Sequence, residues 1–407
     1  MKCRHCTFEL KNTFINLGFA PPSNFYLSSK DLFKLEEYHP LVVKICTNCW
    51  LAQTVDYAAA NQLFSSTYPY FSSTSISWID HAKNYCHQIV QRLQLNQNSY
   101  VVEIASNDGY LLRNFLDMNI PCLGIEPTAS TAVVAEELGI PVLREFFGEA
   151  IAKKLAKGNQ QADLLIGNNV YAHVPNINDF TLGLKALLKP NGVITLEFPH
   201  LMQLIINTQF DTIYHEHFSY LSLYTVQRIF AYAKLRVWDV ERLPTHGGSL
   251  RIYGCHADDP RGSTGAVERI LNDEVDKGLQ SLETYDRFQS SANKVKDDLL
   301  LFLLEQKKKG KVVAAYGAAA KGNTLLNYAG IKNDLISFVC DAAASKQNKF
   351  MPGSHIPILA PDQLEKSDID FLLILPWNIA SEIKHNYSYL EARGTRFVTA
   401  IPKIEIL

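Results

Sequence analysis

Two pairs of cysteines have the spacing of metal-binding knuckles. Cys3 and Cys6 form one Cys-x-x-Cys pair, and Cys46 and Cys49 form the second. Two such knuckles can place four thiolates tetrahedrally around Zn²⁺. Because all four ligands are cysteine, no position remains for a bound water, and we expect the zinc to be structural. Two reduced pairs without a metal are the alternative.

A run of four residues, Tyr214-His215-Glu216-His217, could carry acid–base chemistry. Histidine titrates near neutral pH, a carboxylate can orient it, and a phenol can donate a hydrogen bond. A second metal site and ordinary buried histidines are the alternatives. Because no third metal ligand is evident, we rank catalysis first.

The segment 101–109 combines an apolar strand with a turn of small residues that opens a helix at Gly109. Such a turn lets the backbone approach a cofactor, and Glu126, at the end of the next strand, could bind its ribose hydroxyls. Ala105 and Asn107 stand where a dinucleotide loop would have glycine, which disfavours that class of site. An ordinary strand-to-helix turn is the alternative.

Further polar residues fall on loops that we expect to surround the same cleft. They are Tyr68, Tyr70, His173, and His246 with Arg251. A lone histidine is more often structural than catalytic. His173 is a stronger candidate because it follows a predicted strand, at the carboxyl edge where α/β sheets bind ligands.

A second glycine-containing turn, 315–323, also follows a strand and opens a helix. Backbone N–H groups at that helix start, together with Lys321, suit a diphosphate. Asp341 ends the next strand and could hold a ribose. A tight turn with a surface lysine is the alternative.

Two α/β units position these residues. The first has a helix over 78–93, capped by Ser75 or Ser77, and strands at 100–105, 122–126, 164–167 and 193–197, followed by an antiparallel pair at 236–241 and 249–256. Residues 264–308 have helical spacing. The second unit has strands at 312–316, 336–340 and 371–375. Apolar runs alternating with amphipathic helices predict parallel sheets.

Bulk composition limits the classes of function. At 407 residues and 47% hydrophobic, the chain is long enough for several cores. The net charge of −2 provides no basic field for nucleic acid or anionic lipid. No stretch reaches the roughly 18 apolar residues of a membrane span, so we expect no membrane partner and a cytoplasmic protein.

Taken together, these segments resemble the nucleotide-sugar C-methyltransferases, three-domain enzymes that methylate a carbon of nucleotide-linked ketosugars. The resemblance runs over nearly the whole chain. It is carried by the four cysteines, 68–72, 103–109, 214–217, 246–249 and 316–323. It implies S-adenosylmethionine as methyl donor and a sugar on a nucleotide diphosphate as acceptor.

The resemblance also implies an α/β architecture in three parts. Residues 1–65 form a zinc-binding module, 66–260 a class I methyltransferase domain of Rossmann-like fold, and 261–407 a helical linker with a second, Rossmann-like domain that binds the sugar nucleotide. We expect a monomer.

Roles follow for the matching residues. We assign the cofactor to Glu103, Ala105, Asn107, Gly109, Glu126 and Asn168, and the sugar nucleotide to Tyr68, His246, Arg251, Tyr316, Gly317, Lys321, Asn323 and Asp341. Catalysis is assigned to His217, Glu216, Tyr214, His173 and Tyr70. Two departures affect the nucleotide pocket: the run Ala342-Ala343-Ala344 replaces polar residues and a proline, and Ala319 stands where a proline is common.

Methylation of a carbon requires a carbanion, which a neighbouring keto group stabilises as an enolate. We therefore expect His217 to remove the proton at C3 of a 4-keto sugar, directly or through a water, with Glu216 orienting its ring and Tyr214 or His173 stabilising the enolate oxygen. An O- or N-methyltransferase is the nearer alternative, and a nicotinamide oxidoreductase the more distant one.

Overall fold

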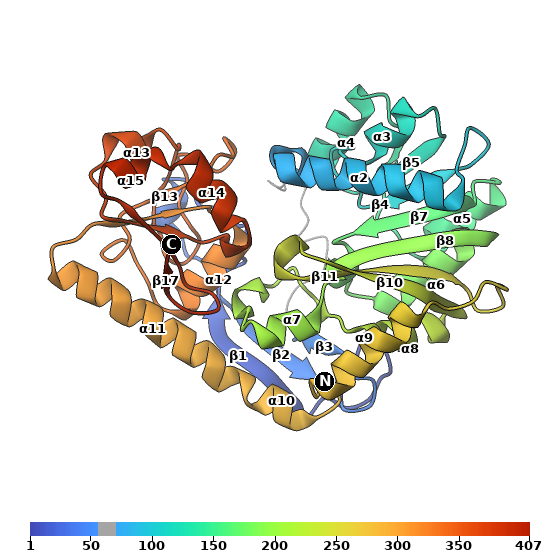
Figure 1. Cartoon of the computed structure of the whole chain (residues 1–407), viewed down its shortest axis with the longest axis horizontal. Helices are drawn as coiled ribbons and strands as arrows, with labels where there is room; N and C mark the ends of the chain where they lie inside the picture. The colour runs from blue at the N-terminus through green and yellow to red at the C-terminus, as the bar shows by residue number, and fades with distance from the viewer. Residues whose placement is uncertain (56–70) are drawn as a thin grey trace.

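The computed structural model describes residues 1–55 and 71–407. The strands of the described residues form three sheets. Figure 1 shows the central sheet on one side and the C-terminal sheet on the other, with the N-terminal strands between them. None of the helices in the described ranges is both long and apolar enough to cross a membrane.

The N-terminal module contains an antiparallel sheet, although its sequence shows little periodicity. Its strands are β1 (Asn12–Ala20), β2 (His39–Ile45), β3 (Ala52–Thr54) and β9 (Ser219–Tyr220), in that order. The pairing of β1 with β2 shifts register twice, so the alternation of buried side chains is broken. Because β9 belongs to the central part of the chain, the sheet fastens the module to it.

The central sheet has seven strands in the order β10-β11-β8-β7-β4-β5-β6. Their bounds are β4 Val101–Ile104, β5 Cys122–Ile125, β6 Val142–Leu143, β7 Ala162–Asn168, β8 Leu188–Pro199, β10 Leu235–Leu243 and β11 Ser249–His256. Strands β4 to β8 are parallel, and β11 pairs antiparallel with both β8 and β10. The predicted parallel sheet with an antiparallel closing pair is confirmed.

Helices cover both faces of this sheet. One layer is α2 (Ile76–Leu93), α3 (Leu112–Asp117) and α4 (Ala129–Glu137), and the other includes α5 (Glu149–Lys157), α6 (Ile177–Leu187) and α8 (Leu223–Tyr232). Successive strand residues point to opposite faces, so Val101 packs in the first layer and Val102 in the second. Ser75 caps α2 by accepting from Trp78 N, as predicted.

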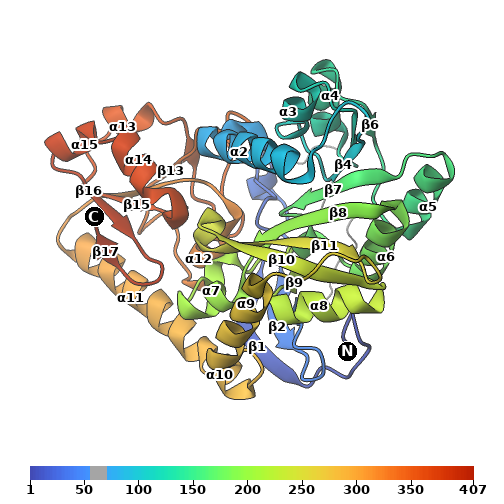
Figure 2. The ribbon, with the colours of Figure 1, turned by 45° about the vertical axis from the view of Figure 1, so that its right-hand side comes forward.

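The region 264–308 is helical, as expected, and forms three helices. They are α9 (Gly265–Asp276), α10 (Leu282–Asp286) and α11 (Phe288–Lys308). The chain turns at Gly278, whose φ of +73° lies in the left-handed region. Figures 1 and 2 show α10 and α11 beside β1, and Phe14 of β1 packs on Tyr285 and Phe288, with ring centroids 5.1 and 4.8 Å away.

The C-terminal sheet has six strands in the order β14-β13-β12-β15-β16-β17. They are β12 Val313–Tyr316, β13 Val339–Cys340, β14 Ile358–Leu359, β15 Phe371–Ile374, β16 Arg396–Thr399 and β17 Glu405–Ile406. Only β17 is antiparallel. Its helices are α12 (Ala320–Tyr328), α13 (Gln363–Lys366), α14 (Ala380–Asn386) and α15 (Tyr389–Ala392). The limits 65/66 and 260/261 between the three parts stay a prediction.

Candidate active site and zinc centre

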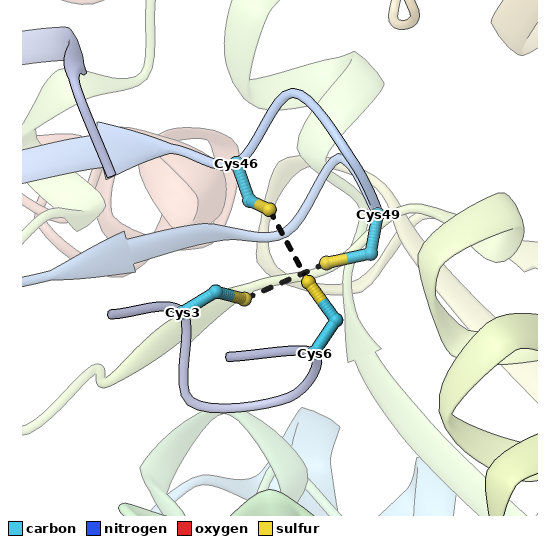
Figure 3. A group of neighbouring side chains, drawn as sticks. All are labelled: Cys3, Cys6, Cys46 and Cys49. Carbon is cyan, nitrogen blue, oxygen red and sulfur yellow. Dashed lines mark hydrogen bonds between the residues drawn. The ribbon is translucent and has the colours of Figure 1, made fainter. Parts of the chain in front are cut away.

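The four cysteines of the two knuckles lie together, with their sulfur atoms turned toward one another (Figure 3). The Sγ atoms of Cys3 and Cys49 are 3.5 Å apart, as are those of Cys6 and Cys46, and all four lie within 4.8 Å of one another. Thiolates placed tetrahedrally at about 2.3 Å from Zn²⁺ stand about 3.8 Å from each other. The donor set and its spacing therefore fit one structural zinc ion.

Backbone hydrogen bonds within the two knuckles orient these sulfur atoms. Thr7 N donates to Cys3 O at 2.9 Å, and Trp50 N donates to Cys46 O at 2.8 Å. Both Thr7 and Trp50 have positive φ, which closes each turn tightly. The Gln53 amide donates to Cys3 Sγ at 3.2 Å, a contact that stabilises the thiolate a metal requires.

The turn after β4 is strongly curved and close to its neighbours. Ala105, Asn107 and Gly109 all have positive φ, and a Cβ on Gly109 would stand 2.5 Å from Ile140 Cδ1. The Glu126 carboxylate accepts from Asn107 N at 2.9 Å and from Thr128 N at 2.8 Å. Glu126 thus orders the turn and retains lone pairs for the hydroxyls of a ribose.

Buried polar atoms without a partner gather at this turn. In the described residues, Glu103 Oε2, Ser106 Oγ, Asp108 Oδ1 and both amide atoms of Asn168 make no hydrogen bond. Burial, with Asp108 and Glu126 nearby, raises the pKa of Glu103. Buried polar atoms are rarely left unpaired, so this group indicates a polar ligand. The carboxyl groups of Glu103, Asp108 and Glu126 suit a ligand with several hydroxyl groups, such as the ribose of S-adenosylmethionine.

His217 is held between a carbonyl and a phenol. Its Nδ1 is 2.9 Å from Thr212 O, and its Nε2 is 2.7 Å from the Tyr214 hydroxyl. A carbonyl can only accept, so Nδ1 carries the proton and the Nε2 lone pair accepts from Tyr214. Burial, with His173 nearby, lowers the pKa of His217 well below its usual range. The imidazole is therefore neutral, as a general base must be.

His173 lies in η3 (Tyr171–His173) directly beside this base. The ring centroids of His173 and His217 are 4.6 Å apart, and His173 Nδ1 donates to Glu216 O at 2.8 Å. Burial lowers the pKa of His173 to about 4, so this ring is also neutral.

The structure corrects one expectation: the Glu216 carboxylate does not orient His217, because the Thr212 carbonyl does so. Glu216 Oε2 accepts from the Asn24 amide at 2.8 Å, and burial raises the pKa of Glu216 to about 7. His217 N donates to Tyr214 O, and this turn brings residues 214 and 217 together while their neighbours point elsewhere. His215 faces His39 of β2, with ring centroids 6.2 Å apart.

Lys321, at the start of α12, brings a positive charge from the C-terminal domain to this cluster. Its charge contributes to the lowered pKa values of His217 and His246. Lys321 Nζ donates to Asn378 Oδ1 at 3.0 Å and lies 4.8 Å from the centre of the Trp377 ring. Burial lowers the pKa of Lys321 itself, although nearby Asp211 opposes this effect.

Trp377, in η6 (Trp377–Ile379), joins the two domains at this point. Its Nε1 donates to Asp211 Oδ2 at 2.7 Å, and a Cβ on Gly247 would collide with its ring. His246 Nε2 lies 3.1 Å from Asn169 Nδ2, at the end of β7. The 245–247 loop is therefore placed between the central sheet and the C-terminal domain.

The second glycine-containing turn follows β12 and opens a helix, and its predicted role in binding the sugar nucleotide stays a prediction. Its backbone leads into α12, and Gly317 has a φ of +92°. Asp341 accepts from Ala343 N at 2.8 Å and lies 3.4 Å from Lys346 Nζ. The Asn323 amide donates to Ser23 O at 2.6 Å, so this side chain holds the N-terminal module. The Tyr316 hydroxyl lies 3.0 Å from that of Tyr387.

Arg251 lies within the central domain, in a buried ionic network. Its guanidinium donates to Glu197 Oε2 at 2.8 Å and is only 3% exposed. The same oxygen lies 2.9 Å from His81 Nε2, and Glu197 Oε1 accepts from Thr245 Oγ1 at 2.8 Å. Arg251 therefore contacts the site through the 245–247 loop, whereas we expected it to bind the sugar nucleotide itself.

Tyr68 and Tyr70 lie outside the described residues. Sequence reasoning missed Asn24, Thr212, Glu197 and Trp377, which contact the predicted residues Glu216, His217, Arg251 and Lys321. Thr212 is close to the 214–217 run, but its main-chain carbonyl has no sequence signature. Of these four, only Glu197 stands out in the sequence, as a charged residue within a mainly apolar stretch.

Comparison with known proteins shows a match over the whole chain. It is 32% identical to C-methyltransferase NovU of Streptomyces niveus over 406 residues, covering 100% of this chain and 96% of that protein. Three family models match consecutive segments: "Putative zinc binding domain" at 3–64, "Methyltransferase domain" at 78–240 and "C-methyltransferase C-terminal domain" at 244–402.

Two solved methyltransferase structures each match about half of this chain. The 1,6-didemethyltoxoflavin-N1-methyltransferase of Burkholderia thailandensis covers 51% of this chain and 96% of its own, at 16% identity and a TM-score of 0.38. A methyltransferase from Anabaena variabilis, dependent on S-adenosylmethionine, covers 49% and 96%, at 13% identity and a TM-score of 0.39. Likenesses at this level carry no argument about the reaction.

Proposed function

Since this chain belongs to the C-methyltransferase family and takes its methyl group from S-adenosylmethionine, we propose that its acceptor is C3 of a 4-keto deoxysugar linked to a nucleotide diphosphate. The Tyr214–His217 pair carries the proposal. It combines a neutral base with a hydrogen-bond donor in one buried place, and enolate formation needs both.

In the absence of substrate, the base and the hydrogen-bond donor are hydrogen-bonded to each other. Tyr214 now donates to His217 Nε2. When a keto oxygen takes over this hydroxyl, the lone pair of Nε2 becomes free for the neighbouring C–H. His217 accepts the proton of C3 while Tyr214 donates to the oxygen that gains negative charge, and Thr212 O holds the imidazolium by its Nδ1–H.

The low pKa of His217 is compatible with this role. In the resting protein, burial and the neighbouring positive charge of Lys321 disfavour the imidazolium. The enolate places a negative charge beside the ring, which favours the imidazolium. His217 therefore stays unprotonated at neutral pH in the resting protein. It becomes a stronger base only when negative charge develops on the substrate.

Bound S-adenosylmethionine supplies an electrophilic methyl group, and the protein aligns it with the carbon and excludes water. Glu103, Glu126 and Asn168 stand where they can hold this donor, because their polar atoms are buried at the turn after β4. Trp78 of α2 bridges this turn and the acceptor side, with ring centroids 6.1 Å from Tyr110 and 5.2 Å from His246.

The C-terminal domain supports the nucleotide part of the proposal. Lys321 and the N–H groups at the start of α12 suit a diphosphate, and Asp341 ends the neighbouring strand, where a ribose can be bound. Ala342 to Ala344 border this position and present only methyl groups, so we expect them to influence which base is accepted.

Mass spectrometry tests the proposal. The protein is incubated with a 4-keto-6-deoxy sugar nucleotide and methyl-deuterated S-adenosylmethionine, and the product is fragmented. We expect the label on ring carbon C3, and solvent deuterium at C3 when the donor is omitted. Label on another atom would show a different acceptor position.

Two variants separate the base from its surroundings. We expect His217→Asn to lose both methyl transfer and exchange at C3 while it keeps cofactor affinity. His215→Asn, in the same run but facing β2, is the matched control and should keep methyl transfer. Exchange retained in His217→Asn would assign the base elsewhere.

A further inference from the structure

We propose that Asn24, in the loop that follows β1 of the zinc-binding module, is a positioning residue for Glu216 and completes the acceptor site. The Asn24 amide donates to Glu216 Oε2 at 2.8 Å, although 192 positions separate them in sequence. Glu216 is only 2% exposed and lies between Tyr214-His215 and the base His217. The module thus contributes to the site a side chain that the zinc does not need.

Contacts on both sides of Asn24 fasten its loop to the C-terminal domain. Ser23 O accepts from the Asn323 amide at 2.6 Å, and the Tyr26 hydroxyl donates to Ala318 O at 2.5 Å. These partners lie in the turn and helix start that we assign to the sugar nucleotide. The loop therefore joins Glu216 of the central domain to the nucleotide side of the site.

The Leu27–Phe350 pairing holds the next part of this loop. Leu27 N donates to Phe350 O at 3.0 Å, and Phe350 N donates to Leu27 O at 2.8 Å. Farther along, Glu36 accepts from Gly353 N and lies 2.8 Å from His355 Nε2. With so many fixed points, the Asn24 side chain has little freedom to leave Glu216.

The Asn24 amide favours the charged form of Glu216. Burial raises the pKa of Glu216 to about 7, and the hydrogen bond from Asn24 opposes this shift. The titratable groups close to Glu216 are Tyr26 on the same loop, His173, whose Nδ1 donates to Glu216 O, and His217. Burial keeps all three neutral at pH 7. Asn24 is thus the contact that sets both the orientation and the protonation of this carboxyl.

This inference rests on the proposed function, but one of its tests does not require a substrate. The full chain, loaded with zinc, is labelled with ¹³C at glutamate carboxyls and titrated by NMR. The Glu216 signal is identified by its loss in Glu216→Gln. We expect its midpoint near pH 7, and a rise of at least about half a pH unit in Asn24→Ala, because the side-chain donor is lost and only the backbone donor of residue 24 remains.

Phe25→Ala is the matched control. Phe25 lies between Asn24 and Tyr26, and its side chain is largely exposed, at 64%. This variant should leave the Glu216 midpoint and kcat unchanged. Zinc content, cofactor affinity and thermal midpoint are measured for both variants, so that a misfolded protein is recognised.

Kinetics then tests the role in the reaction. We expect Asn24→Ala to lower kcat about ten- to a hundredfold, the loss expected for one hydrogen bond to a charged group, with a smaller change in KM. Asn24→Asp, which replaces the donor by a charge, should be slower still. The inflection of the pH–rate profile should move to higher pH in Asn24→Ala, whichever form of Glu216 is active.

Two results would overturn the inference: an unchanged Glu216 midpoint in Asn24→Ala, or a shifted midpoint with unchanged kcat and pH profile. A failure of the proposed function would give a result that differs from both of these. In that case the wild-type protein methylates no nucleotide ketosugar, while the NMR titration still decides whether Asn24 controls Glu216.

Discussion

Replacing Glu197 by alanine should destabilise the central sheet strongly. Glu197 is fully buried and accepts from Arg251, His81 and Thr245. Its removal leaves the Arg251 guanidinium buried with a partial set of partners. Breaking a buried ion pair in this way typically costs about 3–5 kcal/mol.

The remaining partners of Arg251 place the expected cost at the lower end of this range. Glu241 lies 3.5 Å away but is 39% exposed, and the Tyr85 ring centre is 4.4 Å from the guanidinium carbon. We therefore expect about 3 kcal/mol for Glu197→Ala. Glu197→Gln keeps an acceptor for Thr245 and should cost about 2 kcal/mol.

Hydrogen exchange measured on peptides of β8 and β11 is the suitable assay, because unfolding of a chain with several domains is not a two-state process. A loss of 3 kcal/mol corresponds to about a 150-fold fall in protection. Glu136→Ala, which breaks an exposed pair with Arg144, is the control and should leave protection of these peptides nearly unchanged.

The pH dependence has a defined sign. Burial acts to raise the pKa of Glu197, but the hydrogen bond from His81 and the charge of Arg251 outweigh it and lower this pKa. The contribution of Glu197 to stability is therefore complete above its ordinary pKa of 4.5 and is lost as pH falls through the lowered folded value. A fall in protection of less than about fivefold in Glu197→Ala would refute this account of the network.

Three further outcomes are expected. Cys46→Ser should lose the bound zinc, measured by metal analysis, while Cys86→Ser should keep one equivalent because Cys86 lies outside the cluster. Glu126→Ala should weaken binding of S-adenosylmethionine about ten- to a hundredfold by calorimetry, and unchanged affinity would place the ribose elsewhere. Gly109→Ala should lower both the thermal midpoint and cofactor affinity, because the new methyl group meets Ile140 at 2.5 Å and φ is +78°; a wild-type midpoint would contradict the packing argument.

The sequence alone was sufficient for features that depend on local spacing. The two Cys-x-x-Cys pairs predict a metal site, because each four-residue knuckle turns its two sulfurs to the same side and four thiolates together suit one zinc ion. The central strands were recognisable in the sequence because short apolar runs that end in small residues, at Ala105 and Gly167, are typical of buried parallel strands. Strand β1 was not predicted, because its bulged pairing with β2 removes the alternation of apolar and polar residues by which a strand is recognised.

Only the tertiary structure decided which polar atoms meet. The ring of His217 is oriented by a main-chain carbonyl, which any residue at position 212 would supply. Glu216 turns to Asn24 because the N-terminal loop packs there, and Lys321 reaches the histidines because Trp377 fastens the C-terminal domain. Protonation in a buried site depends on such distant partners and on exclusion of water, and neither is set by neighbours in the chain.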